Sequence, residues 1–417
     1  MINMNRTLYI YFDDAYAAQP ALVGTLESQL LRSKEVFSFA FAEEWLCSTR
    51  CRMLDPELQL YAGRQYLADN KSNFGVFLDS TPDRWGRVLM ERRESLIAEQ
   101  EQRSRKTMYE TDFLLGVHDE TRMGALRIKT DIDGEFLDNN AQWSAPPITS
   151  LAELEQASWL LEQENIPQAR KWLQILLAPG SSLGGARPKA NVKNTDGRLW
   201  IAKFPSRNDK TNIGAWEALT MELARRCHIQ VAPFEVKYMN NRHAIFLTQR
   251  FDRDHMGRRV HFTSAMTMLG YSDGDTQGFS YLELADWISR YCYCVEENLQ
   301  ELFRRIVFNI AVSNCDDHLR NHGFLLTRNG WTLAPAYDLK PQYYGIGLSL
   351  NINEKDNRLA YDLAMEVAPY FGVSQEKANA IIAHTKTTVA CWRQLATQYH
   401  IPREEQELMA SAFHTLA

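Results

Sequence analysis

The spacing of apolar residues divides the chain into a first half with many strands and a second half built mostly from helices. Aromatic and β-branched runs at 8–12 and 36–41 are typical of strands, and the charged stretch 82–103 has the apolar spacing of a helix. From residue 281 onward the helical spacing dominates, with one strand-like insert at 323–333. The pattern therefore predicts an α+β fold whose strands lie mainly in the first half.

The middle of the chain predicts several strands around one helix. Apolar runs on both sides of the turn signal NTDG at 194–197 are the signature of a hairpin. The stretch 214–229 has the apolar spacing of a helix, and it precedes a further pair of strand-like runs at 235–240 and 243–253.

Length and one polar connection predict more than one domain. With 417 residues, the chain exceeds the size of an ordinary single domain. The stretch 131–150 is polar and contains a double proline, which is typical of a connection. We predict an N-terminal subdomain at 1–130, a β-containing lobe at 131–280 and a helical lobe at 281–417.

Composition narrows the class of protein. The net charge of −6 gives no overall basic footprint for nucleic acid, although a local basic patch is compatible with it. The first residues lack the apolar core of a signal peptide, and no run of 18 apolar residues is present. The seven scattered cysteines favour reduced thiols over a disulfide framework. We therefore expect a cytoplasmic protein.

The segment SSLGGARPKA at 181–190 combines two glycines, two serines and two cations, but it matches neither standard phosphate-loop pattern. Lys203 ends the strand that follows, where a lysine can reach into a cleft or simply face solvent. In protein kinases a strand lysine contacts the nucleotide phosphates and pairs with a helix glutamate. Glu217 and Glu222, both on the next helix, are the two candidate partners.

The segment NCDDHLRNHGFLL at 314–326 carries the strongest chemical signal. Asp316 and Asn321 are five residues apart, the spacing of the aspartate and asparagine in the kinase catalytic loop. Such a spacing lets the aspartate meet a hydroxyl while the asparagine holds a phosphate-bound Mg²⁺. Asp338 follows after a predicted hairpin, as the second metal-binding aspartate of kinases does.

A competing interpretation of the same segment is a metal-dependent hydrolase. Asp316, Asp317, His318 and His322 could form a metal cluster. Such a site normally draws ligands from other segments, and the remaining histidines form no recognisable motif. The order of Lys203, Asp316, Asn321 and Asp338 favours the kinase interpretation.

Taken together, these motifs resemble the HipA family of serine/threonine kinases, the toxins of bacterial toxin–antitoxin modules. The resemblance rests on SSLGGARPKA, WIAKFP, FLTQRFDR, HFTSAMTMLG, NCDDHLRNHGFLL and LAPAYDL, in this order, and on FGVFLDSTPDRWGR in the N-terminal part. It implies a kinase-like fold of two lobes, with an added N-terminal subdomain, an all-helical C-terminal half and ATP bound between the lobes.

The resemblance also implies roles for individual residues. Asp316 is the expected catalytic residue, Asn321 and Asp338 are the expected Mg²⁺ ligands, and Ser182, or its neighbour Ser181, is the expected autophosphorylation site. The expected ATP contacts are Gly184, Gly185, Ala186, Arg187, Lys189, Lys203, Gln249, Arg250, Phe251 and His318. Gln249 stands where the family pattern suggests an acidic residue, which leaves a backbone contact to adenine. The serines could equally be turn formers, and His318 could be structural.

The partners implied by the resemblance are a HipB-like helix-turn-helix antitoxin and a protein substrate, aminoacyl-tRNA synthetases being among the family's substrates. DNA would be contacted only through the antitoxin, and no membrane is involved. Two other functions remain open: a small-molecule kinase of the antibiotic or sugar type, and a non-catalytic protein that sequesters a partner.

Overall fold

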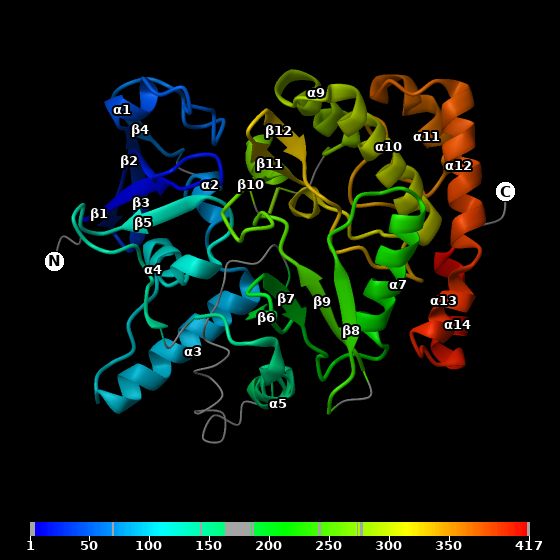
Figure 1. Ribbon diagram of the computed structural model, residues 1–417, viewed down its shortest axis with the longest axis horizontal. Coiled ribbons are helices and arrows are strands. Elements are labelled where there is room, and N and C mark those ends of the chain that lie inside the picture. Colours follow the sequence, from blue (N-terminus) through cyan, green and yellow to red (C-terminus); the bar gives the residue numbers. More distant parts are fainter. Residues whose placement is uncertain are drawn as a thin grey trace. The chain divides into compact units, whose positions relative to one another are not determined.

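The computed structural model describes residues 5–68, 71–141, 144–162, 185, 187–240, 243–272, 274–275 and 278–414. The chain forms two compact units (Figure 1). The first unit comprises Met1–Ala202 and Asp252–Asp273, and the second comprises Lys203–Phe251 and Gly274–Ala417. The finer division at residues 130 and 280 stays a prediction.

The first unit contains most of the strands. Its strands are β1 (Arg6–Phe12), β2 (Ala21–Leu31), β3 (Lys34–Phe41), β4 (Arg64–Tyr66), β5 (Leu126–Lys129), β6 (Lys189–Lys193), β7 (Leu199–Lys203, the last residue of which opens the second unit) and β10 (His261–Ser264). Its helices are α1 (Glu43–Leu46), α2 (Gly75–Leu78), α3 (Arg84–Gln100), α4 (Glu110–Leu115), α5 (Leu151–Glu162) and α8 (Ala265–Met268).

A five-stranded antiparallel sheet with the order β4-β3-β2-β1-β5 forms the centre of the first unit. Side chains alternate along β1, so Leu8, Ile10 and Phe12 are buried while their neighbours are partly exposed. The β1–β2 register shifts at Ile10. Gly24 lies opposite this shift, and any Cβ there would collide with the backbone carbonyl of Ala40.

The second unit is mostly helical. Its helices are α7 (Ile213–Arg226), α9 (Tyr281–Tyr291), α10 (Val295–Val312), α11 (Tyr361–Val367), α12 (Gln375–Val389), α13 (Trp392–Gln398) and α14 (Arg403–Met409). Two antiparallel hairpins accompany them, one of β8 (Phe234–Lys237) with β9 (Ile245–Gln249) and one of β11 (Gly323–Thr327) with β12 (Gly330–Leu333).

The core of the second unit joins α7 to the C-terminal helices. Trp216 of α7 packs against Trp392, with ring centroids 6.0 Å apart, and Trp392 stacks on Phe413 at 4.3 Å. Phe308 and Val312, from the end of α10, belong to the same buried cluster. This packing fixes α7 and the end of α10, the two helices that lead into the candidate site.

The structure confirms the predicted α+β class and most of the predicted elements. The strand-like insert at 323–333 is the hairpin β11–β12, so the C-terminal half is helical apart from this hairpin. The long strand β2 was not anticipated, because its apolar residues are interrupted by Gly24, Glu27 and Ser28. Within the described residues, no helix has both the length and the apolar character needed to cross a bilayer.

Asn212 is the residue on which the position of α7 depends most directly. Its side-chain oxygen accepts hydrogen bonds from the backbone of Ala215 at 3.3 Å and of Ala244 at 2.8 Å, and its own backbone N–H donates to Glu405. One buried side chain thus caps the helix and ties it to the chain segment just before β9.

We predict that Asn212→Ala lowers the free energy of unfolding by about 2 kcal/mol, because a cap is lost and a buried donor is left unpaired. Ser374→Ala removes an exposed cap of α12 and is the matched control. It should cost about 1 kcal/mol or less. Urea unfolding followed by tryptophan fluorescence measures both, and equal losses would contradict the assignment of Asn212.

Candidate active site

A partly buried cation with two carboxylates forms the centre of the candidate site. Lys203, at the end of β7, places its ammonium 2.5 Å from Glu217 and 2.8 Å from Asp338. Glu217 lies in the second turn of α7 and is 2% exposed, so Lys203 is the partner that offsets its buried charge. The structure thereby distinguishes the two candidate glutamates, because Glu222 pairs instead with arginines on its own helix.

The charges in this cluster stabilise one another. Burial works against the charge of Asp338, but Lys203 and Lys340 outweigh it and hold the pKa of this carboxyl well below its usual range. Burial likewise opposes the charge of Lys203, yet Asp338 and Glu217 raise the pKa of its ammonium. Lys340 contacts Asp338 at 2.7 Å on Oδ1, the same oxygen that Lys203 uses. The other oxygen, Oδ2, takes no part in these two ion pairs.

The loop after α10 is held against the segment that carries Asp338. Helix α10 ends at Ser313 in a left-handed conformation with φ 48°. Asn314 accepts a hydrogen bond from the backbone of Lys340 at 3.1 Å. Tyr337 donates its hydroxyl to the carbonyl of Arg320 at 2.6 Å. These bonds place Asp316, Asn321 and Asp338 in one region of the second unit.

Within this loop, the side chain of Asp316 faces solvent and that of Asn321 is buried. Asp316 is exposed, so its carboxylate can meet a substrate. The amide nitrogen of Asn321 donates to the carbonyl of Asp316 at 2.9 Å. This bond orients the side chain and leaves the amide oxygen as the atom that suits a cation. Nδ1 of His318 is buried and has no hydrogen-bond partner among the described residues, as expected of an atom that meets a ligand or water.

Asp317 anchors the loop to helices α9 and α10 through hydrogen bonds inside the second unit. It accepts hydrogen bonds from the Tyr281 hydroxyl at 2.5 Å and from Asn309 at 2.9 Å, and it pairs with His322 at 2.8 Å. Burial opposes its charge, but the interaction with His322 and the bond from Tyr281 bring the pKa of Asp317 below its usual value. Asp317 and His322 are therefore used inside the fold. No group of three or more metal-ligating side chains gathers in the described part of the chain, so the hydrolase interpretation gains no support.

The predicted adenine-binding segment follows β9. The backbone N–H of Gln249 donates to the carbonyl of Pro233 at 2.8 Å, so a backbone contact to adenine would have to use another atom. Arg250 is buried. The ring of Phe251 lies against Tyr337, with ring centroids 5.5 Å apart, which joins this segment to the neighbour of Asp338.

The predicted phosphate loop belongs to the first unit. Ser181, Ser182, Gly184 and Ala186 lie outside the described residues. Gly185 adopts a φ of +98°, a conformation that favours glycine, and Arg187 is half-buried.

Lys189 is 6% exposed, and its ammonium contacts Asp83 at 2.7 Å. Trp85 donates its indole N–H to the Lys189 carbonyl at 3.2 Å, which explains why the PDRWGR segment accompanies the loop motif.

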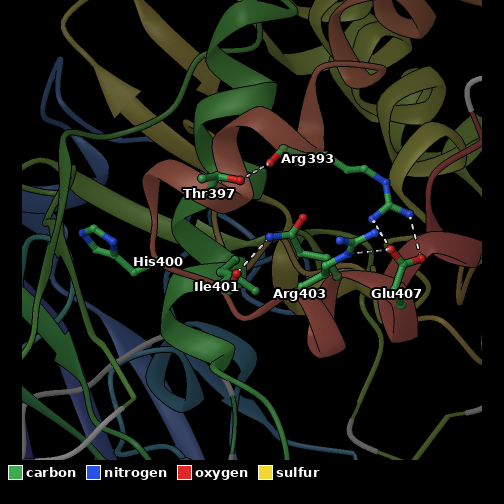
Figure 2. Close-up of a pocket in the computed structure, with 7 residues that line it drawn as sticks. Arg393, Thr397, His400, Ile401, Arg403 and Glu407 are labelled. Atoms are coloured by element: carbon green, nitrogen blue, oxygen red, sulfur yellow. Dashed lines mark hydrogen bonds and ion pairs between the residues drawn. The ribbon is translucent and has the colours of Figure 1, made fainter.

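The second unit also has an open hollow that is separate from the Lys203 cluster. It has a volume of about 720 Å³ and is lined by residues of α13 and α14 and of the turn between them. Figure 2 shows Arg393 and Arg403 both directed at Glu407, so its charges are largely satisfied within the wall. None of the residues of the Lys203 cluster lines it, and we assign it no part in the chemistry.

Comparison with known proteins identifies the family. The model of the HipA-like C-terminal domain matches residues 181–392, just over half of the chain. This range contains Lys203, Asp316, Asn321 and Asp338. The chain belongs to the HipA family.

Individual relatives agree with this assignment. The HipA chain in a complex of HipA, HipB and operator DNA from Shewanella oneidensis has a TM-score of 0.64 and 17% identity, with 97% of this chain and 94% of that chain covered. This likeness shows that the two share the HipA fold.

Two curated relatives are named as kinases. "Putative kinase Y4mE" of Sinorhizobium fredii is 27% identical over 38% of this chain and 41% of its own length. A "Putative kinase" of Haemophilus influenzae is 32% identical over 24% of this chain and 31% of its own length. The matches thus span less than half of these relatives.

Several residues that contact the candidate residues within each unit were missed in the sequence. Asn314 and Tyr337 hold the two site segments together, Asp83 pairs with Lys189, and Tyr281 supports Asp317. Asn314 and Tyr337 are direct neighbours of recognised motif residues, and this adjacency was the only local signal. Asp83 and Tyr281 act across more than 30 residues, and spacing alone gives no sign of that.

The charged state of Asp338 should appear in the pH dependence of stability. The pKa of Asp338 is lower in the folded protein than in the unfolded chain, where it is about 3.9. The contribution of this carboxylate to the free energy of unfolding is therefore complete above about pH 3.9 and is lost as the pH falls through the folded pKa. Below about pH 4 the wild type should therefore lose stability relative to Asp338→Asn by up to about 1.4 kcal/mol per pH unit.

Urea unfolding of both proteins between neutral and acid pH measures this difference. Asp286→Asn, which changes an exposed acid paired with Arg290 on α9, is the matched control. Its curve should run parallel to that of the wild type. Parallel curves for Asp338→Asn as well would show that the Lys203 cluster does not hold this carboxyl in its charged form.

Proposed function

We propose that this HipA-family chain is a protein kinase that transfers the γ-phosphate of ATP to a serine or threonine hydroxyl. The proposal rests on one observation: an ion-pair cluster and the loop that carries Asp316 and Asn321 lie side by side in the second unit. Lys203, Glu217 and Asp338 form a single ion-pair cluster, and the bonds of Asn314 and Tyr337 hold the Asp316–Asn321 loop beside it. Kinases require these same parts.

Each residue has a role that follows from its surroundings. Lys203 is fixed by Glu217 and presents its positive charge to the ATP phosphates. Asp316, which is exposed, accepts the proton of the attacking hydroxyl. The hydroxyl oxygen forms the new bond to the γ-phosphorus, the bond from this phosphorus to the β–γ bridging oxygen breaks, and ADP leaves. Alignment and charge neutralisation supply most of the rate enhancement.

The residues present fit Mg²⁺, which is implied by the family. The amide oxygen of Asn321 and Oδ2 of Asp338 are hard oxygen donors, the type that Mg²⁺ prefers alongside substrate phosphates. Asp338 is held in the ionised form that a ligand must have. The ion, when bound, would neutralise the charge of the phosphates. Lys340 contacts Oδ1 of the same carboxylate, so Oδ2 remains as the oxygen for the ion.

The remaining parts of the proposal rest on the family alone. Gly185, Arg187 and Lys189, with Gly184 and Ala186, would contact the ATP phosphates, and Gln249, Arg250, Phe251 and His318 would complete the nucleotide site. Ser182, or Ser181, would receive a phosphate and switch the enzyme off, since a phosphoserine adds about 1.5 to 2 negative charges near the ATP phosphates. Mass spectrometry after incubation with ATP would locate this phosphate.

A HipB-like helix-turn-helix protein is the proposed partner, supported by the HipA–HipB–DNA complex of the Shewanella relative. Any DNA contact would then be made through that partner. The proposed substrate is a protein, with an aminoacyl-tRNA synthetase as the first to test.

The proposal is tested by Asp316→Asn. We expect this variant to lose incorporation of labelled phosphate by a factor of about 10² or more, because the proton acceptor is gone. Thermal stabilisation by Mg-ATP should persist, since the phosphate and metal contacts remain. Unchanged transfer would overturn the role of Asp316, and a wild type that neither binds Mg-ATP nor transfers phosphate would indicate a non-catalytic protein.

The ion pair on α7 gives a second test. Glu217→Gln should lower kcat about tenfold or more, because Lys203 loses the partner that fixes its position. Glu222→Gln is the matched control, since Glu222 lies on the same helix and pairs only with surface arginines. Steady-state kinetics of phosphate incorporation compares them. Equal effects of the two substitutions would contradict the assignment of Glu217.

A further inference from the structure

An uncharged segment follows directly after the Asp338 motif. Residues 341–352, here called the strap, read PQYYGIGLSLNI and contain no charged side chain. Leu348, Leu350 and Ile352 are buried and hold the strap to the fold. Tyr344 and Ile346 point the other way: they are 69% and 94% exposed. Tyr343 adds a partly exposed ring against Tyr344, with ring centroids 5.1 Å apart.

The strap is tied to the loop after α10 at two places along its length. The backbone N–H of Gln342 donates to the carbonyl of Ser313 at 3.0 Å, and the Ser349 hydroxyl donates to the carbonyl of Cys315 at 2.7 Å. Gly345 lies so close to Cys315 that any side chain at position 345 would collide with its sulfur. Cys315 directly precedes Asp316. The exposed side chains of the strap are therefore held beside the residue proposed to activate the hydroxyl.

The exposed apolar side chains of the strap indicate an interaction surface. Single exposed apolar residues are ordinary, but neighbouring exposed apolar residues mark interaction surfaces. Three such residues fall within four positions of the strap, and the nearest charged residues along the chain are Lys340 directly before it and Glu354 two positions after it. Because the strap's own side chains are uncharged, the part of a partner that lies on them is expected to be apolar.

We propose that Tyr344 and Ile346 bind an apolar side chain that neighbours the phosphate-accepting serine or threonine of a protein substrate. The inference rests on the proposed kinase function and adds a sequence preference to it. Small ligands bind in concave sites that surround most of their surface. Tyr344 and Ile346 protrude, which suits an extended polypeptide lying across them. Their tie to Cys315 favours the substrate over a second copy of the chain or an antitoxin as the occupant.

The test uses the full-length chain, Mg-ATP and a library of peptides with one central serine and randomised flanking positions. Sequencing of the phosphorylated pool by mass spectrometry gives the preference at each position. For the wild type we expect apolar residues to exceed charged ones about tenfold at one flanking position. Ile346→Asp and Tyr344→Asp should abolish this enrichment, because packing an apolar side chain against a carboxylate would desolvate the charge without a partner. Ile346→Leu should retain it.

Tyr370→Asp is the matched control, because Tyr370 is 67% exposed in the same unit but lies outside the strap. It should keep the preference, and all variants should keep thermal stabilisation by Mg-ATP. Phosphate transfer without an apolar preference, or a preference that survives in Ile346→Asp, overturns the inference and leaves the kinase proposal standing. A changed oligomeric state in Ile346→Asp with an intact preference also overturns it. Absence of transfer to any acceptor overturns the kinase proposal, and the inference with it.

Discussion

The bridge from Lys203 to Glu217 and Asp338 is the interaction on which the rest of the site depends. It joins the end of a strand, the second turn of a helix and the segment after a hairpin, three parts separated by up to 135 positions. A buried ion pair seldom adds more stability than apolar side chains of the same size would give. Glu217 is buried, and Lys203 and Asp338 are partly buried. We therefore relate this cluster to the proposed function rather than to stability.

The adjacent carboxylates of Asp316 and Asp317 lie in different surroundings, one exposed and one buried. Asp317 is buried, accepts two hydrogen bonds and contacts His322, so it is used within the second unit. Asp316, one residue earlier, is exposed, and its carboxylate is the one proposed to meet a substrate. Paired carboxylates placed in different surroundings commonly take different roles. The left-handed Ser313 and the bonds of Asn314 turn the chain so that these neighbours face opposite ways.

The sequence predicts local features of this protein and fails where distant segments meet. Asp316, Asn321 and Asp338 could be proposed from the sequence because their spacing along one stretch of chain is itself the signal. Glu217 and Glu222 could not be separated, since both lie on one amphipathic helix and only the fold shows which side faces Lys203. Five residues correspond to about 140° of rotation around a helix, so the two glutamates point in very different directions. Asp83 and Tyr281 act through contacts that no local pattern records.

The conformation of Asp338 links the chemical site to the surface beside it. Its φ of +59° lies in the left-handed region, which is uncommon outside glycine but more frequent for aspartate than for most residues. The conformation lets the carboxylate meet Lys203 while the chain after it returns to the catalytic loop, where Lys340 bonds Asn314 and Gln342 bonds Ser313. The strap therefore begins only three residues after the proposed metal ligand. A change in the position of Asp338 would shift the exposed side chains of the strap as well, so the chemistry and the proposed recognition of the substrate depend on the same turn of the backbone.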